Sequence, residues 1–169
     1  MINWLYFPHT ASLDDTSMRI VNIFKKHADA IDSTNHTHSS NTVLSMLSAD
    51  LIDFGFQVET GKTSDAKVRV PVLYGLNGMT QLAFEADAYY SPANYVVEIE
   101  AGRAVTNYQF LKDFFEACAM QNADYLCIAV RNIYYHGSKD FEKVCQFFEA
   151  LYASNRLQIP LKGLLIVGY

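Results

Sequence analysis

The 169-residue sequence lacks any apolar run near the roughly 20 residues that a membrane-spanning helix needs. Its first residues also lack a basic leader and a cleavage-site pattern, so we expect no membrane segment and a cytoplasmic location. Cysteine is scarce: Cys118, Cys127 and Cys145 stand in apolar runs without the spacing of metal ligands. We therefore expect three reduced, buried thiols.

Basic residues are also fewer than acidic residues. Thirteen Lys and Arg residues against eighteen Asp and Glu residues leave a formal net charge of −5. This balance speaks against a broad nucleic-acid-binding surface, although it is compatible with a local basic cleft. The sequence contains no Walker loop, no G-x-G-x-x-G, no G-x-S-x-G and no zinc-type Cys/His spacing. Nucleotide-dependent phosphoryl transfer, dinucleotide redox chemistry and serine-hydrolase chemistry therefore lack support.

What is abundant is apolar and aromatic residues, at 50% and 14% of the chain. Such a composition predicts a folded domain, and the length suits a single domain over 1–169. The polar stretch "DSTNHTHSSN" (32–41) separates an expected N-terminal helical extension (1–40) from the remainder.

The period of the apolar residues predicts the order of the elements. Helical spacing occurs in 13–31, where Ser12 or Asp14 is placed to cap, and in 41–54, which Gly55 should end. Beyond these helices we expect strands at 56–60, 67–75, 80–90, 94–100, 124–130 and 163–169, with helices at 104–121 and 141–152. The apolar stripe expected on the first of those two helices comprises Val105, Tyr108, Leu111, Phe115 and Cys118. This order predicts an α/β (α+β) fold, a mixed sheet flanked by helices.

Four acidic residues stand within the strand-like stretch "AFEADAYYSPANYVVEIEAGRA" (83–104): Glu85, Asp87, Glu98 and Glu100. Side chains alternate across a strand, so each strand has one apolar face and one acidic face. If Tyr90 lies opposite Tyr95, the acids of the two strands face each other. Like charges placed opposite each other destabilise a sheet. Either a divalent cation compensates them, or they form the solvated face of an edge hairpin.

The same residues carry a family resemblance. The stretch "LIDFGFQVE" (51–59) runs from helix into strand, Asp87 lies in "FEADAYY", and "VVEIEAGRA" (96–104) opens into a helix. This arrangement, over roughly 41–130, resembles the PD-(D/E)XK nuclease superfamily, which has the restriction-endonuclease-like fold. The resemblance implies that 41–130 is a nuclease-like core with an extra N-terminal helix. Two positions depart from the motif, because Ala86 replaces the Pro and Glu100 replaces the Lys.

By this resemblance Asp87 and Glu98 are the metal-binding acids, and Glu100 takes the catalytic Lys position. Glu85 is a candidate third metal ligand. The cofactor implied is Mg²⁺ or Mn²⁺, and the reaction is hydrolysis of phosphodiester bonds in DNA or RNA. Family habit adds the expectation of a homodimer.

Three cationic residues are candidates for contacting a nucleic-acid substrate. They are Arg103 after the second acidic strand, Lys112 on the following helix, and Arg131 in the loop "RNIYYHGSK" (131–139). Two other readings stay open. The first is a catalytically inactive relative that binds nucleic acid or another protein, which the missing Lys favours. The second is a glycosidase with a carboxylate pair, which a single Trp and a short chain disfavour.

Overall fold

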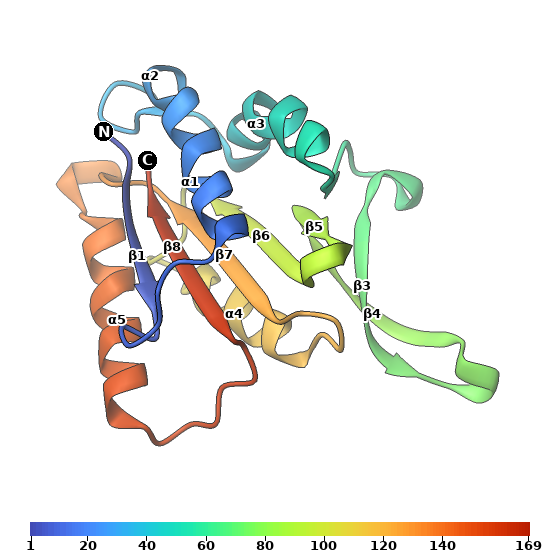
Figure 1. The fold of residues 1–169 in the computed structure, drawn as a ribbon. Helices are drawn as coiled ribbons and strands as arrows, with labels where there is room; N and C mark the ends of the chain where they lie inside the picture. Colours follow the sequence, from blue (N-terminus) through green and yellow to red (C-terminus); the bar gives the residue numbers. More distant parts are fainter.

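A six-stranded mixed sheet forms the centre of the protein in this computed structural model (Figure 1). The structure describes residues 1–169, apart from the side chain of Tyr135. The strands follow the spatial order β1 (Asn3–Phe7), β8 (Gly163–Gly168), β7 (Tyr125–Val130), β6 (Tyr95–Glu100), β5 (Ala88–Tyr90) and β2 (Gln57–Val58). Strands β6, β7 and β8 run parallel, while β1, β5 and β2 pair antiparallel to their neighbours. The mixed sheet expected from the sequence is thus confirmed.

The first strand, β1, was not expected, because 1–40 was predicted to be a helical extension. Instead Asn3–Phe7 pairs with β8 along its whole length and forms one edge of the sheet. Tyr6 and Phe7 are buried, and the Tyr6 hydroxyl donates a 3.1 Å hydrogen bond to Asp14. The strand is short and its apolar run does not alternate cleanly, so period alone could not reveal it.

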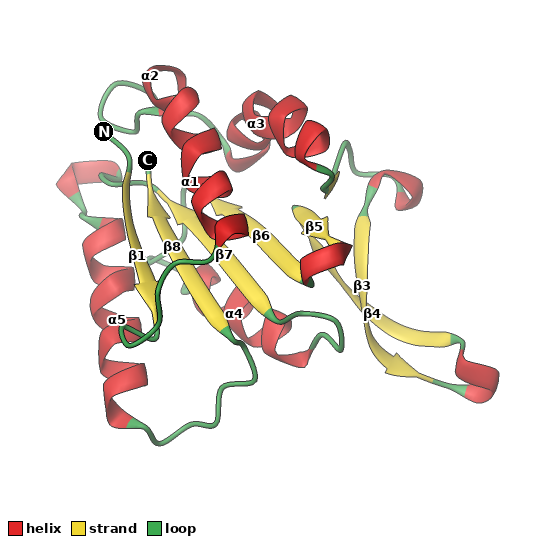
Figure 2. Ribbon diagram, viewed as in Figure 1, coloured by secondary structure: helices red, strands yellow, loops and turns green.

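Two helical layers cover the two faces of the sheet (Figure 2). Helices α1 (Asp15–Lys26), α2 (Ala28–Ile31) and α3 (Ser40–Phe54) bury one cluster; α4 (Gln109–Ala119) and α5 (Asp140–Ser154) bury the other. The predicted helix 13–31 is interrupted at His27, so it forms α1 and α2. The caps agree with the sequence: Asp14 accepts from the amide of Ser17 at 2.9 Å, and Gly55 ends α3 at φ 112°.

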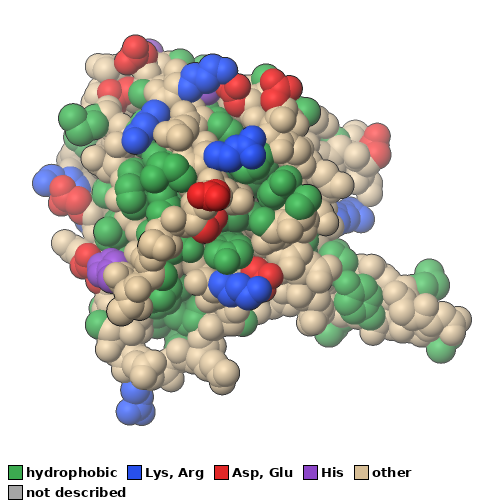
Figure 3. All heavy atoms as spheres, viewed as in Figure 1, with side chains coloured by type: hydrophobic (Ala, Val, Ile, Leu, Met, Phe, Trp, Pro, Cys, Tyr) green, Lys and Arg blue, Asp and Glu red, His purple; other side chains and the backbone are tan. Residues whose placement is uncertain are grey.

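The expected strand 80–90 is divided at Asp87 into two strands with different partners. Residues before it form β4 (Thr80–Ala86), which pairs only with β3 (Val68–Tyr74), and residues after it form β5. The β3–β4 hairpin projects from the body of the protein (Figure 1). Val68 and Val70 are buried at its base, whereas its far part exposes apolar side chains and shows little charge (Figure 3). Those exposed side chains belong to Leu73, Tyr74, Leu76, Met79 and Leu82.

Short 3-10 turns join several of these elements, at Ser64–Ala66, Leu76–Gly78, Ser91–Ala93 and Tyr135–Gly137. The three cysteines are free thiols; Cys127 and Cys145 are buried, and Cys118 is partly exposed. None of the helices in the described structure has both the length and the apolar character needed to cross a membrane.

Candidate active site

Asp87 occupies the junction where the chain leaves the hairpin and enters the central sheet. Its Oδ2 accepts a 2.7 Å hydrogen bond from the amide of Ile99 on β6. Its own amide hydrogen-bonds the carboxylate of Glu98, and its carbonyl accepts from the amide of Glu59 at 2.8 Å. Tyr90 lies opposite Tyr95, the register that the sequence analysis took as a condition. Backbone groups therefore hold the Asp87 carboxylate beside the acidic face of β6.

The acidic face of β6 is directed at the helical layer that contains α4. Tyr95, Val97 and Ile99 pack on the side of α1 and α3, so Glu98 and Glu100 project to the opposite side. Both carboxylates are partly buried. Strand β6 lies between β5 and β7, so it is no edge strand. For Glu98 and Glu100 the alternative of a solvated edge face is therefore wrong, and another explanation of their position is needed.

Helix α4 contributes an acid that the sequence reading missed, Asp113. The helix begins at Gln109 and buries Phe110, Asp113, Phe114 and Ala117, one position away from the predicted stripe. Phe115 and Tyr108, expected inside, are 58% and 64% exposed. The sequence did contain a signal for this face of the helix: Asp113 shares the helical spacing of Phe110, Phe114 and Ala117. A buried Asp usually has a partner, so such a position suggests a functional or paired carboxylate.

Asp113 is only 5% exposed, and its Oδ2 accepts no hydrogen bond from any side chain or backbone group described. Its carboxyl group forms a hydrogen bond with that of Glu100. Because two carboxylates cannot hydrogen-bond without a proton, Asp113 and Glu100 share one proton. Asp113, Glu100, Glu98 and Asp87 form what we call the acid cluster.

Burial raises the pKa values of all four acids, and repulsion from neighbouring acids adds to the rise for Asp87, Glu98 and Asp113. Burial raises the pKa of Asp87 to about 6, helped by Glu59 and Glu100 and opposed by the bond from Ile99. Burial raises the pKa of Asp113 to about 8, and the charge of Glu100 adds to the effect. The pKa values of Glu98 and Glu100 are also raised, again mainly by burial. Groups with such shifts, gathered in one place, mark a candidate functional site.

Two lysines act on the acid cluster from different elements. Lys67, at the start of β3, contacts Glu59 at 2.9 Å and Glu85 at 3.3 Å, and its charge favours ionised Asp87. Lys112 on α4 lies 3.8 Å from Asp113, and its charge acts on Glu98 and Glu100. The sequence singled out Lys112 but not Lys67 as a source of positive charge.

Glu85 occupies a different environment from the other predicted acids. It lies on β4 opposite Arg69 of β3, and its carboxylate contacts Lys67 at 3.3 Å and Arg69 at 3.9 Å. The break at Asp87 turns β4 away from β6, so the expected pairing of Glu85 with Glu100 does not form. The charge of Glu85 is thus balanced by ion pairs with Lys67 and Arg69, without a metal ion.

The donor chemistry of the acid cluster suits a divalent metal ion. Carboxylate oxygens are the preferred ligands of Mg²⁺ and Mn²⁺, and the buried Oδ2 of Asp113 has an unused acceptor site. Among the described residues, however, no three His, Cys, Asp or Glu side chains are arranged so that they could hold a metal ion together. The cluster thus offers the type of ligand that a divalent metal prefers, while the described side chains do not form a three-ligand site.

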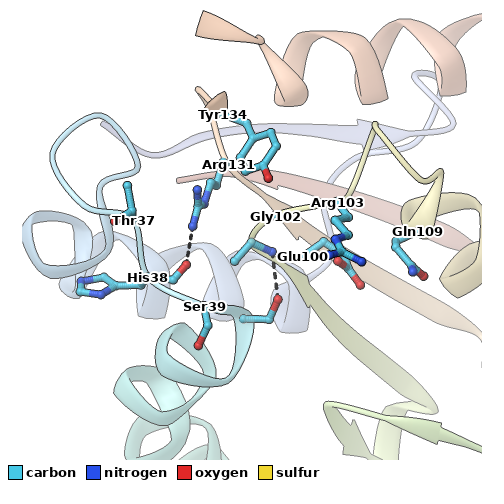
Figure 4. Close-up of a pocket in the computed structure, with 11 residues that line it drawn as sticks. Thr37, His38, Ser39, Glu100, Gly102, Arg103, Gln109, Arg131 and Tyr134 are labelled. Atoms are coloured by element: carbon cyan, nitrogen blue, oxygen red, sulfur yellow. Dashed lines mark hydrogen bonds between the residues drawn. The ribbon is translucent and has the colours of Figure 1, made fainter. Parts of the chain in front are cut away.

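Next to the acid cluster lies a cavity of about 580 Å³, which we call the strand-end cavity (Figure 4). Its walls come from the ends of β6 and β7 and from the residues that open α3 and α4. Glu100 lines it, so the cavity adjoins the cluster. Arg103 and Arg131, two of the predicted substrate-binding residues, line it as well, whereas Lys112 does not.

The overall arrangement is similar to that of a solved DNA-cleaving enzyme. The crystal structure of restriction endonuclease BglII complexed with a DNA 16-mer aligns over 99% of this chain and 75% of its own, with a TM-score of 0.57 and 8% sequence identity. The chain has a restriction-endonuclease-like fold. The structure of free BglII also aligns over 99% of this chain and 78% of its own, with a TM-score of 0.49 and 9% identity. No protein-family model matches the sequence, and no curated protein does.

Proposed function

We propose that this protein is a divalent-metal-dependent nuclease that hydrolyses phosphodiester bonds of DNA or RNA. The observation that carries the proposal is the acid cluster at the bend between β4 and β5, facing α4 within a restriction-endonuclease-like fold. Similarity to a restriction endonuclease supports only the fold, because proteins with unrelated functions can share one fold. The cluster supplies the site-level argument.

Asp87 and Glu98 are the proposed ligands of Mg²⁺ or Mn²⁺, with Glu100 beside them. When bound, a divalent ion lowers the pKa of water and neutralises charge on the phosphate. The protein's own part is to hold the carboxylates in place. The amide of Ile99 fixes Asp87, and the amide of Asp87 fixes Glu98, so neither side chain has to be ordered on binding.

Glu100 stands where the family resemblance expects Lys, and we propose that it accepts the proton of the attacking water. Asp113 supports this role through the hydrogen bond that it shares with Glu100, which orients the Glu100 carboxylate. Lys112 and Lys67 supply positive charge to the cluster. Glu85, engaged with Lys67 and Arg69, is not among the proposed ligands.

A second candidate function is an inactive relative that binds nucleic acid or another protein. Two observations favour it: Glu100 replaces the motif Lys, and no three described donors are arranged to hold a metal. Such a protein binds nucleic acid, or a protein partner, without metal-dependent cleavage.

A cleavage assay separates the two functions. Fluorescent single- and double-stranded DNA and RNA are incubated with wild-type protein in Mg²⁺, Mn²⁺ or EDTA. The nuclease proposal predicts metal-dependent products that are lost in Asp87→Asn and Glu98→Gln but retained in Asp29→Asn, an exposed acid of α2. Binding without products on any substrate supports the inactive relative instead.

A further inference from the structure

We infer that the strand-end cavity binds a phosphate group of the nucleic acid, next to the bond that the acid cluster is proposed to cleave. The inference rests on the proposed function for the identity of the ligand as a nucleic acid. The cavity itself, with its two guanidinium groups, is observed independently of that function.

The strand-end cavity combines apolar surface and the Glu100 carboxylate with several groups that can bind an anion. Hydroxyl and amide side chains of Thr37, Ser39 and Gln109 stand around it, together with the guanidinium groups of Arg103 and Arg131. Ser40 also lines it, and its hydroxyl accepts a 3.0 Å hydrogen bond from the amide of Ala101. This bond joins the start of α3 to the end of β6, so the cavity wall is held from both sides.

Arg131 is a fixed cation in this wall. The residue is 7% exposed, and its guanidinium donates a hydrogen bond to the carbonyl of His38. The guanidinium also lies 5.3 Å from the centre of the Tyr134 ring and contacts the Tyr169 hydroxyl. Guanidinium has five N–H donors in a planar fork, so these contacts leave donors for a further acceptor.

Arg103 supplies the second positive charge and is exposed rather than buried. It follows Gly102, which carries no side chain, and a Cβ built there would meet only the Tyr134 hydroxyl, at 3.9 Å. The strand-end backbone is thus open to the cavity at this point. In Figure 4 the side chains of Arg103, Glu100 and Gln109 lie on one side of the opening, and those of Arg131 and Tyr134 lie on another.

The position of Glu100 connects the strand-end cavity with the acid cluster. Glu100 lines the cavity and also hydrogen-bonds Asp113 inside the cluster. A nucleic-acid strand with one phosphate at the cluster therefore has a neighbouring phosphate at the cavity. Because phosphate contacts position a strand without reading its bases, the cavity would fix the register of the scissile bond.

The test measures binding without metal, so that it does not depend on cleavage. Short labelled DNA oligonucleotides are titrated into full-length protein in EDTA, and affinity is measured by fluorescence anisotropy. One oligonucleotide has a 5′-phosphate, one has a 5′-hydroxyl, and a third carries an uncharged methylphosphonate at an internal position. Wild-type protein is compared with Arg103→Gln and with Arg156→Gln, an exposed arginine beyond α5.

The inference predicts that Arg103→Gln weakens binding about tenfold, while Arg156→Gln binds as wild type does. Tenfold corresponds to about 1.4 kcal/mol, within the range of one charge-assisted hydrogen bond. In wild type, removing the bound phosphate's charge should weaken binding to a similar extent. Sensitivity to the 5′-phosphate identifies a terminal phosphate as the ligand; sensitivity to the methylphosphonate identifies an internal one.

Equal affinity of wild type for all three oligonucleotides overturns the inference, as does equal loss in Arg103→Gln and Arg156→Gln. An absence of measurable binding in EDTA also overturns it. None of these results decides the proposed function, which the metal-dependent cleavage assay tests. Conversely, phosphate-dependent binding without cleavage upholds the cavity and leaves the protein an inactive relative.

Discussion

The carboxylate of Asp87 accepts a 2.7 Å hydrogen bond from the amide of Ile99, the residue between Glu98 and Glu100. One backbone contact thus joins the break between β4 and β5 to β6, the strand that carries Glu98 and Glu100. The bond also stabilises ionised Asp87 against the burial that raises its pKa to about 6. The position of Asp87 in the acid cluster consequently depends on the contact between the β4–β5 break and β6.

Metal-free protein should lose stability as the pH rises from about 4 to about 8. The pKa values of Asp87 and Asp113 are raised from 3.8 to about 6 and about 8. An acid whose pKa is higher in the folded state stabilises folding below its unfolded pKa, and this stabilisation disappears as the pH passes the folded pKa. Asp113→Asn, which cannot ionise, should flatten this dependence.

Thermal unfolding in EDTA at pH 5 and pH 8 measures this effect. We expect the midpoint of wild type to fall by several degrees between the two, since each kcal/mol shifts it by about 2–4 °C for a domain of this size. The exposed Asp29 supplies the control, and Asp29→Asn should follow wild type. An identical fall in Asp113→Asn would contradict the account of the acid cluster.

Lys67→Met should raise the pKa of Asp87. The lysine contacts Glu59 and Glu85, and its charge lowers the pKa of Asp87. Removing this charge leaves Asp87 facing Glu59 with less compensation. Carboxyl ¹³C NMR of Asp87 across a pH titration measures the change, with exposed Lys62→Met as the matched control. A pKa that moves equally in both variants, or in neither, would show that Lys67 does not act on the cluster.

Gly163→Ala should destabilise the protein by about 1–3 kcal/mol, the usual cost of overpacking. A Cβ at this position would overlap the hydroxyl of Tyr6 and approach its ring carbon to 2.6 Å. Tyr6 lies on β1, so the variant tests the pairing of β1 with β8. Gly61→Ala, whose Cβ would meet Ala66 at an ordinary 3.5 Å, is the control. Equal urea midpoints for the two variants would argue against β1 at that edge.

Local sequence signals predicted the helices and the parallel core well. The apolar period located α1 and α3. Asp14 was one of the two candidate caps of α1 and Gly55 was the expected end of α3, because caps are short-range features. The apolar runs at 124–130 and 163–169 likewise indicated the strands β7 and β8, which are buried. The short turn between the two strands allowed the pairing of Tyr90 with Tyr95 but did not determine it.

Tertiary relationships were less accessible from the sequence. Nothing in the period of 80–90 marks Asp87 as a change of partner strand, so Glu85 was placed with the wrong neighbours. On α4, two apolar stripes one residue apart are compatible with the sequence. The predicted stripe did not include Asp113, whereas the stripe that is buried does. Lys67 and Glu59 come to the cluster from segments that only the fold brings together.

The central claim is that the acid cluster binds a divalent metal ion, and calorimetric titration tests it most directly. Mn²⁺ and Mg²⁺ are titrated into wild type, Asp87→Ala and the control Asp29→Ala, with thermal unfolding recorded in parallel. A bound ligand raises stability as RT ln(1 + [L]/Kd), so a millimolar site is detectable. The titration is repeated with a short, uncleavable oligonucleotide, since phosphate completes the coordination of Mg²⁺ in many sites.

The account predicts heat and stabilisation in wild type and Asp29→Ala, and neither in Asp87→Ala. An absence of response in wild type, even with the oligonucleotide present, would contradict the claim and leave an inactive relative as the function. A response of Asp87→Ala equal to that of wild type would place the metal elsewhere.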